Sequence, residues 1–248
     1  MIRIHLKIAA AVLVLALFAA AVAFVVWAND EAPATEIALN ALNSDSQVFV
    51  SAEHGWVIFH PAETPRPETG FIFYPGARVD YRAYAPVLRL IAAQGYFVVL
   101  TPAPLNIALF DTNAAARVQA AYPEIQNWFV GGHSLGGTAA SAYAAVHPDI
   151  KGLALWASTP ADDALLIRDT PVLSVYATND GLFPLEMVKD SQDLLPADAE
   201  FVAIEGGNHA QFASYGPQAG DRAASIPPEE QWTLAANATT DFFEKVLR

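Results

Sequence analysis

One serine in this chain lies between glycines in a pattern that suggests nucleophilic chemistry. The run Gly132-His133-Ser134-Leu135-Gly136 follows a segment rich in aromatic and β-branched residues, and an alanine-rich run comes after it. The spacing Gly-x-Ser-x-Gly between a strand and a helix is typical of a nucleophile elbow. The sharp turn lifts the serine hydroxyl clear of the sheet, and small neighbours let strand and helix pass closely. We therefore predict that Ser134 is a covalent nucleophile rather than part of an ordinary glycine-rich turn.

A carboxylate and an imidazole follow the serine in the order that this elbow requires, Ser then Asp then His. Asp180 lies in a Thr-Asn-Asp-Gly turn after the apolar run 171–177, and His209 ends a Gly-Gly-Asn-His turn after the run 201–204. We predict that His209 takes the proton of Ser134, while Asp180 fixes the imidazole tautomer and stabilises the imidazolium. The alternative acids are interpreted as solvated loop carboxylates: Asp162, Asp163 and Asp221.

These side chains need a scaffold, and the pattern of apolar runs predicts one. Strands are expected at 47–51, 56–60, 71–74, 96–100, 128–131, 152–157, 171–177 and 200–204. Helices are expected at 81–94, 113–121, 138–147, 160–166, 184–195 and 228–247. This alternation predicts an α/β fold with a doubly wound, mainly parallel sheet between helices. Ligands in such sheets bind at the carboxyl ends of the strands, and all three predicted catalytic residues follow a strand.

The amino-terminal segment predicts a membrane span. Residues 8–28 carry no polar side chain, and they lie between Arg3 and Lys7 on one side and Asp30 and Glu31 on the other. At about 1.5 Å per residue the run covers roughly the 30 Å hydrocarbon core. We interpret 1–28 as an anchor with its basic end in the cytoplasm, which places the catalytic domain outside. A cleaved signal peptide is the alternative, and it would make the protein secreted or periplasmic.

Composition limits what the rest of the chain can be. Residues 29–46 are expected to be a tether, and 47–248 are long enough for one catalytic domain with a single core. The net charge of −13 argues against nucleic acid or anionic lipid as a partner. Because the chain has no cysteine, it has no disulfides, thiol nucleophiles or cysteine metal sites. No cluster of His, Asp and Glu has metal-ligand spacing.

The chain resembles the α/β-hydrolase fold family, in particular small bacterial members related to dienelactone hydrolase. The resemblance covers about 47–248 and is carried by Tyr74-Pro75-Gly76-Ala77, by 131–137, by Asp180 and by 206–212. It implies an eight-stranded sheet and neither a metal nor an organic cofactor. It also implies an oxyanion hole made by the N–H groups of Leu135 and Ala77. A sizeable cap domain is not expected, since only 158–170 joins the two strands where a lid is usually inserted.

These features predict an exported serine hydrolase that cleaves small-molecule carboxylic esters. A non-catalytic surface-binding protein on the same fold is the alternative, and a thioesterase, peptidase or acyltransferase would use the same triad. Without a lid, the loops 81–90 and 102–110 are left to wall a shallow pocket, which favours short to medium acyl chains. Its candidate apolar lining residues are Leu105, Ile107, Leu109 and Phe110. Arg78 could contact an acidic substrate group or form a surface ion pair. The sequence leaves the oligomeric state open.

Overall fold

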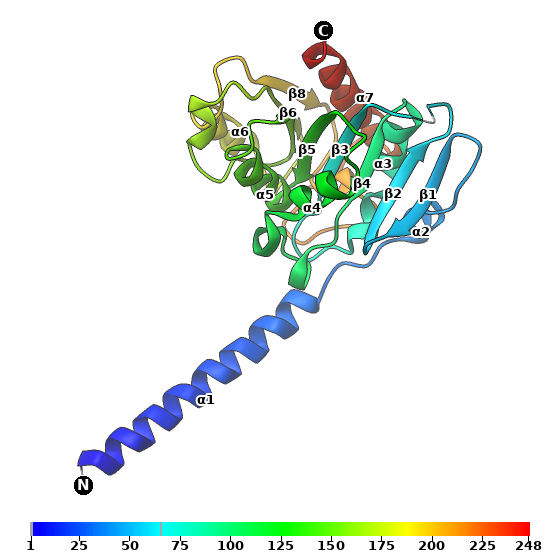
Figure 1. The fold of residues 1–248 in the computed structure, drawn as a ribbon. Helices are drawn as coiled ribbons and strands as arrows, with labels where there is room; N and C mark the ends of the chain where they lie inside the picture. The colour runs from blue at the N-terminus through cyan, green and yellow to red at the C-terminus, as the bar shows by residue number, and fades with distance from the viewer. Residues whose placement is uncertain (1, 65) are drawn as a thin grey trace.

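The computed structural model describes residues 2–64 and 66–248, with the side chains of residues 2–6 and 8 outside that description. Its centre is an eight-stranded sheet in the order β1-β2-β4-β3-β5-β6-β7-β8 (Figure 1). The strands are β1 (Val48–Glu53), β2 (Trp56–Pro61), β3 (Thr69–Tyr74), β4 (Phe97–Leu100), β5 (Asn127–His133), β6 (Ile150–Trp156), β7 (Val172–Ala177) and β8 (Glu200–Ile204). The pairs β1–β2 and β2–β4 are antiparallel and the others are parallel. The predicted mainly parallel α/β sheet is confirmed.

Helices cover both faces of the sheet (Figure 1). The helices of the domain are α2 (Glu36–Asn40), α3 (Ala85–Ala93), α4 (Ala114–Ala121), α5 (Leu135–Ala144), α6 (Leu185–Gln192) and α7 (Pro228–Val246), and α1 (Ile2–Asn29) precedes them. Helices α3 and α7 pack into one core with Phe129 of β5, while α4 and α5 pack into the other with Trp128 and Val130. This alternation is the two-residue period of a strand that is buried on both faces. It explains why the strands read as continuous apolar runs.

The parallel strands bring four loops to one edge of the sheet. Strands β3, β5, β7 and β8 all run in the same direction, so the segments that follow them meet at their carboxyl ends. These segments contain Ala77, Ser134, Asp180 and His209 respectively. We call this side of the sheet the active-site edge.

The segment from Asn29 to Ser46 differs from the loose tether that the sequence suggested. Ala32 forms a parallel bridge with Val79, and the Thr35 N–H donates to the Ser214 carbonyl at 2.9 Å. Helix α2 follows, and its Ala38 side chain is fully buried. These contacts depend on backbone groups of distant segments, so no hydrophobic period within 29–46 could reveal them. The segment is a packed strap across the domain.

Helix α1 projects from the domain as a single rod (Figure 1). Residues Ala9–Asn29 are long and apolar enough to cross a membrane, and none of their most apolar window is buried against the domain. A signal sequence has the same properties, so length and composition leave both interpretations of residues 1–28 open. The division into anchor and catalytic domain remains a proposal.

Candidate active site

Ser134 occupies the turn between β5 and α5 with a backbone that few L-residues adopt. Its φ is 51° and its ψ is −127°. Two hydrogen bonds hold its backbone there, because its N–H donates to the Trp156 carbonyl at 2.9 Å and its own carbonyl accepts from the Ser158 hydroxyl at 2.6 Å. Strain of this kind survives only where the surrounding structure over-determines it. The turn therefore has the geometry that the elbow motif predicts.

The two flanking glycines explain the spacing of the motif. A Cβ on Gly132 would lie 2.5 Å from the Gly136 carbonyl carbon, and one on Gly136 would lie 2.2 Å from the Tyr74 carbonyl oxygen. Both distances are far below van der Waals contact, and the atoms met are backbone atoms that cannot move aside. Only glycine fits these positions, which lets α5 start directly over the ends of β3 and β5.

Asp180 and His209 form a buried pair on the loops after β7 and β8. The Asp180 Oδ2 atom lies 2.8 Å from His209 Nδ1, and the two residues are 1% and 3% exposed. The other carboxylate oxygen, Oδ1, accepts the N–H groups of Leu182 at 2.7 Å and Phe183 at 2.6 Å. With Nδ1 donating to the carboxylate, the Nε2 atom of His209 is left as the acceptor. The pair thus has the orientation that a general base requires.

His209 also lies beside the end of the elbow strand. Its ring centroid is 4.4 Å from that of His133, the residue before Ser134. The structure therefore places the Asp180–His209 pair beside the residue that precedes Ser134 in the chain. It places two of the alternative acids, Asp162 and Asp163, in exposed positions on the loop after β6.

Asp221, interpreted from the sequence as a solvated loop carboxylate, instead joins the two catalytic loops. Its Oδ1 accepts the Gly181 N–H at 3.0 Å, and its Oδ2 accepts the Ala210 N–H at 2.9 Å. Those donors are the residues directly after Asp180 and His209 in the chain. Asp221 therefore fixes the spacing between the acid loop and the histidine loop. The sequence carried no signal for this role, since aspartate in a polar loop is common.

A second clamp holds the histidine loop against α7. Gln231 is fully buried, its Oε1 accepts the Asn208 N–H at 3.0 Å, and its Nε2 donates to the Asn208 carbonyl at 2.7 Å. The Asn208 side chain in turn accepts from the Gln211 N–H and donates to the Arg222 carbonyl. The backbone on either side of His209 is thus bonded to both α7 and the loop that carries Asp221.

The N–H groups of Leu135 and Ala77, expected to form an oxyanion hole, belong to the segments that follow β5 and β3. Leu135 is the first residue of α5, so its N–H belongs to the helical turn that has no intrahelical acceptor. Ala77 is half-buried and follows the β3 strand. The preceding Gly76 N–H donates to the Tyr84 hydroxyl at 2.9 Å, which fixes the loop that carries Ala77.

His133, in the variable position of the motif, packs against this same network. Its Nδ1 lies 2.8 Å from the Tyr84 hydroxyl, which is itself held by the Gly76 N–H. Burial, and next the neighbouring His209, hold the pKa of His133 well below its ordinary value. Burial also raises the pKa of Tyr84, so its hydroxyl keeps its proton and donates to Nδ1. A neutral His133 therefore links the elbow to the oxyanion loop.

Arg78 forms a structural ion pair rather than facing the site. Its Nη2 donates to Asp30 Oδ2 at 2.9 Å and to the Asp30 carbonyl at 2.7 Å. Its Nε donates to the Trp27 carbonyl at 2.9 Å. With its donors occupied by the end of α1 and the start of the strap, Arg78 serves to attach that helix.

The loops expected to wall the pocket are short. The connection after β6 contains only the 3₁₀ helix η4 (Ala164–Ile167), so no sizeable cap covers the edge. After β4 come η2 (Pro104–Asn106) and η3 (Ala108–Asp111). Of the predicted lining residues, Ile107 is buried. The remaining three are exposed on the surface: Leu105, Leu109 and Phe110.

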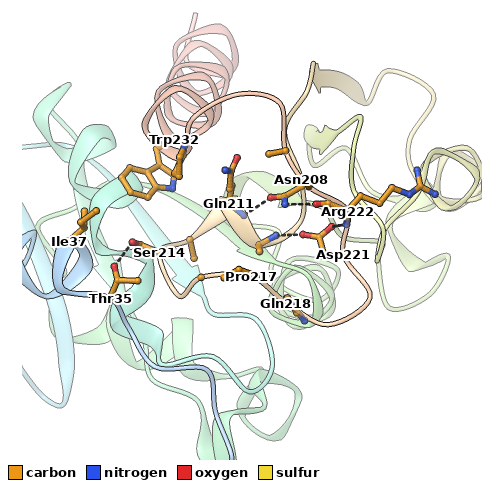
Figure 2. Close-up of a pocket in the computed structure, with 16 residues that line it drawn as sticks. Thr35, Ile37, Asn208, Gln211, Ser214, Pro217, Gln218, Asp221, Arg222 and Trp232 are labelled. Atoms are coloured by element: carbon orange, nitrogen blue, oxygen red, sulfur yellow. Dashed lines mark hydrogen bonds between the residues drawn. The ribbon is translucent and has the colours of Figure 1, made fainter.

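A cavity of about 510 Å³ lies against the histidine loop (Figure 2). Asn208 and Gln211 of that loop, Trp232 of α7 and Thr35 of the strap contribute to its wall. Ser134 and His209, although described by the structure, do not line it. The cavity thus borders the segments that position His209 and is separate from the reacting atoms.

Known proteins share this architecture. The Est1E protein of Butyrivibrio proteoclasticus matches with a TM-score of 0.60 and 17% identity, over 82% of this chain and 99% of that one. The esterase domain of a Rhodothermus marinus protein matches with a TM-score of 0.61 and 15% identity over the same shares. A Klebsiella pneumoniae protein assigned as a dienelactone hydrolase gives 0.60 and 15%, over 81% and 98%. At these identities the likeness concerns the fold alone.

Sequence comparison points to the same group. No curated protein matches this sequence, but the family model described as the alpha/beta hydrolase family matches residues 70–233. That match covers most of the chain and includes the elbow, the acid loop and the histidine loop. The chain belongs to the alpha/beta hydrolase family.

Proposed function

We propose that this protein is a serine hydrolase that cleaves carboxylic esters through an acyl-enzyme. The observation that carries the proposal is the buried pair of Asp180 and His209, 2.8 Å apart, on the active-site edge beside the strained Ser134. A buried imidazole with Nδ1 bound to a carboxylate is a base whose free nitrogen faces the site. Such a base supplies what a serine hydroxyl lacks as a nucleophile.

The reaction proceeds in two halves. His209 Nε2 takes the proton of Ser134 Oγ as the oxygen attacks the ester carbonyl, and the imidazolium then gives that proton to the leaving alcohol. In the second half, water loses a proton to His209 and attacks the acyl-enzyme, and Ser134 leaves with the proton returned. Asp180 stabilises the imidazolium in both halves.

The oxyanion of each tetrahedral intermediate is assigned to the N–H groups of Leu135 and Ala77. The first lies at the start of α5, where the helix dipole also favours negative charge. The second is held by the contact between Gly76 and Tyr84. Loss of one such donor in serine hydrolases costs on the order of 10²–10³ in turnover.

A non-catalytic role on the same fold is less well supported. Holding a serine at φ 51° costs on the order of 1–3 kcal/mol, and a pure binding protein gains nothing from that strain. Cleavage of thioesters or amides and acyl transfer would use the same residues. These reactions are therefore included in the substrate test described below. The short loops favour soluble esters with short to medium acyl chains over long ones.

For location, we propose that α1 is retained as a membrane anchor with the catalytic domain outside the cytoplasm. The exposed apolar length of Ala9–Asn29 supports a span, and Lys7 before it and Glu31 after it support this orientation.

The test is labelling with a fluorophosphonate, which reacts with activated serines. The full chain in detergent should give an adduct that maps to Ser134 and that is lost in Ser134→Ala. Ser51→Ala, at a serine on the edge strand β1, should still be labelled. An adduct on another serine would overturn the assignment. Hydrolysis of a p-nitrophenyl ester series, with matching thioesters and amides, then defines the substrate class.

A further inference from the structure

The carboxyl end of α1 is fixed to the active-site edge of the domain. Arg78, four residues after β3, donates to the Trp27 carbonyl, and its guanidinium lies 4.7 Å from the centroid of the Trp27 ring. Asn106 of η2, beyond β4, donates to the Ala28 carbonyl at 3.2 Å. Ala28 is fully buried by these contacts. The direction in which α1 leaves the domain is therefore set by the same loops that border the active site.

Exposed apolar side chains surround the place where α1 leaves. Leu105, Leu109 and Phe110 are 36%, 41% and 55% exposed, and together we call them the η2–η3 patch. The Phe110 ring packs edge-to-face on Phe24 of α1, with centroids 6.1 Å apart. The patch thus continues the apolar surface of α1 onto the domain. Apolar side chains gathered in this way mark an interaction surface more often than scattered ones do.

The contact between Phe110 and Phe24 shows how far the η2–η3 patch lies from the carboxyl end of α1. Phe24 lies five residues before the helix end at Asn29, which at about 1.5 Å per residue is roughly 7 Å inside that end. Amphipathic segments at membrane surfaces bury their apolar faces about 5–10 Å into the boundary between headgroups and acyl chains. If Ala9–Asn29 spans the bilayer, Phe110 at the level of Phe24 lies within that boundary.

We propose that the η2–η3 patch inserts into the surface of the bilayer from which α1 emerges, so that the active-site edge faces the membrane. The occupant of the patch is lipid. Insertion is apolar rather than electrostatic, because the net charge of −13 disfavours anionic headgroups. Helix η3 also packs on α5, the helix that starts after Ser134. Esters with short to medium acyl chains that partition between water and the membrane surface are then concentrated at the mouth of the site.

The proposal goes beyond hydrolysis and can be tested without any activity measurement. Because the chain has no cysteine, single-cysteine variants carry one label each. Leu109→Cys and Phe110→Cys report the patch, and Val14→Cys, in the exposed middle of α1, reports the span. Ile167→Cys is the control, since Ile167 is 87% exposed and lines a hollow with Ile150 at the opposite edge of the sheet.

Each full-length variant is labelled with the environment-sensitive dye NBD and reconstituted into phosphatidylcholine vesicles with or without shallow nitroxide lipids. Labels at 109 and 110 should emit at shorter wavelength than the label at 167 and should lose fluorescence when nitroxide lipid is present. The label at 167 should be unaffected. Labels at 109 and 110 that behave like the one at 167 would overturn the proposal. So would a label at 14 that remains in water, because α1 would then not span the bilayer.

Discussion

At the scale of single residues, the site combines a strained serine with a buried carboxylate whose oxygens accept several hydrogen bonds. Ser134 holds a positive φ, while the buried carboxylate of Asp180 receives two backbone N–H groups and one imidazole. The hydrogen bonds to Leu182 and Phe183 fix the carboxylate of Asp180 in position, and its Oδ2 orients the His209 ring. This orientation is the condition that the proposed mechanism needs.

Replacing the acid tests this condition. Asp180→Asn should retain the fold yet lower turnover on the order of 10³–10⁴-fold, because the imidazole loses the anion that selects its tautomer. The measurement is kcat on a p-nitrophenyl ester, with circular dichroism as the check on folding. Asp163→Asn, at an exposed carboxylate of the loop after β6, is the matched control and should be fully active. A fully active Asp180→Asn beside an inactive Asp221→Asn would mean that the wrong carboxylate was chosen.

His133 should make the stability of the protein depend on pH. Its pKa is held well below its ordinary value by burial and by His209, so the folded chain keeps it neutral while the unfolded chain protonates it below about pH 6.5. Above that pH, His133 is neutral in both the folded and the unfolded chain, and it does not lower the free energy of unfolding. Below it, the free energy of unfolding falls by up to about 1.4 kcal/mol per pH unit for this group.

Urea unfolding in detergent at pH 7.5 and 5.5 measures this dependence. His133→Asn should show a smaller loss on acidification than the unchanged protein. Burial also lowers the pKa of His60, which is half-buried. His60 therefore contributes to the pH dependence of the free energy of unfolding, and that contribution remains in His133→Asn. An equal pH dependence in both proteins would show that His133 is not the group being titrated.

At the scale of elements, the two catalytic loops are joined by one side chain. Asp221→Ala would leave the N–H groups of Gly181 and Ala210 without their acceptor, at a cost of up to about 1–3 kcal/mol for the N–H of the buried Ala210. We expect at least about a tenfold loss in kcat/KM, because misplaced loops stabilise the transition state less well. A loss of about 1.4 kcal/mol of transition-state stabilisation is a factor of ten in rate. Labelling by fluorophosphonate should slow in parallel.

The comparison variant for Asp221 is Asp163→Ala. If Asp221 acts by positioning, the rate of labelling should fall more steeply than the melting temperature relative to that control. A variant that melts earlier but reacts at the normal rate at low temperature would reduce Asp221 to a stabilising residue.

A structural feature could be predicted from the sequence where its pattern lies in consecutive residues. The elbow, the strands and the terminal helix carry their patterns in consecutive residues, so glycine spacing and two-residue or helical periods predicted them. The packing of the strap and the role of Asp221 depend on hydrogen bonds between segments far apart in the chain. No pattern of consecutive residues encodes such contacts. The exposure of Leu105, Leu109 and Phe110 was not predicted either, because it depends on how the loop after β4 folds in three dimensions.

At the scale of the whole molecule, α1 is joined to the sheet domain by a packed segment and not by a flexible linker. The strap from Asn29 to Ser46 is packed, and Arg78 holds the end of α1 against the loop after β3. The direction of α1 relative to the active-site edge is therefore set by these contacts. A longer, flexible connection would let the site face any direction.

The orientation of the chain across the membrane is the last prediction. Arg3 and Lys7 at the amino-terminal end of α1, with Asp30 and Glu31 after the helix, should keep the amino terminus in the cytoplasm and the catalytic domain outside. Protease added to intact spheroplasts should therefore digest the domain, while a cytoplasmic marker protein survives. Moving the basic residues to the other end, as in Lys7→Glu with Asp30→Lys and Glu31→Lys, should increase the protected fraction. Complete protection of the unchanged protein, with digestion only after lysis, would mean that the domain lies in the cytoplasm and that its ester substrates are cytoplasmic as well.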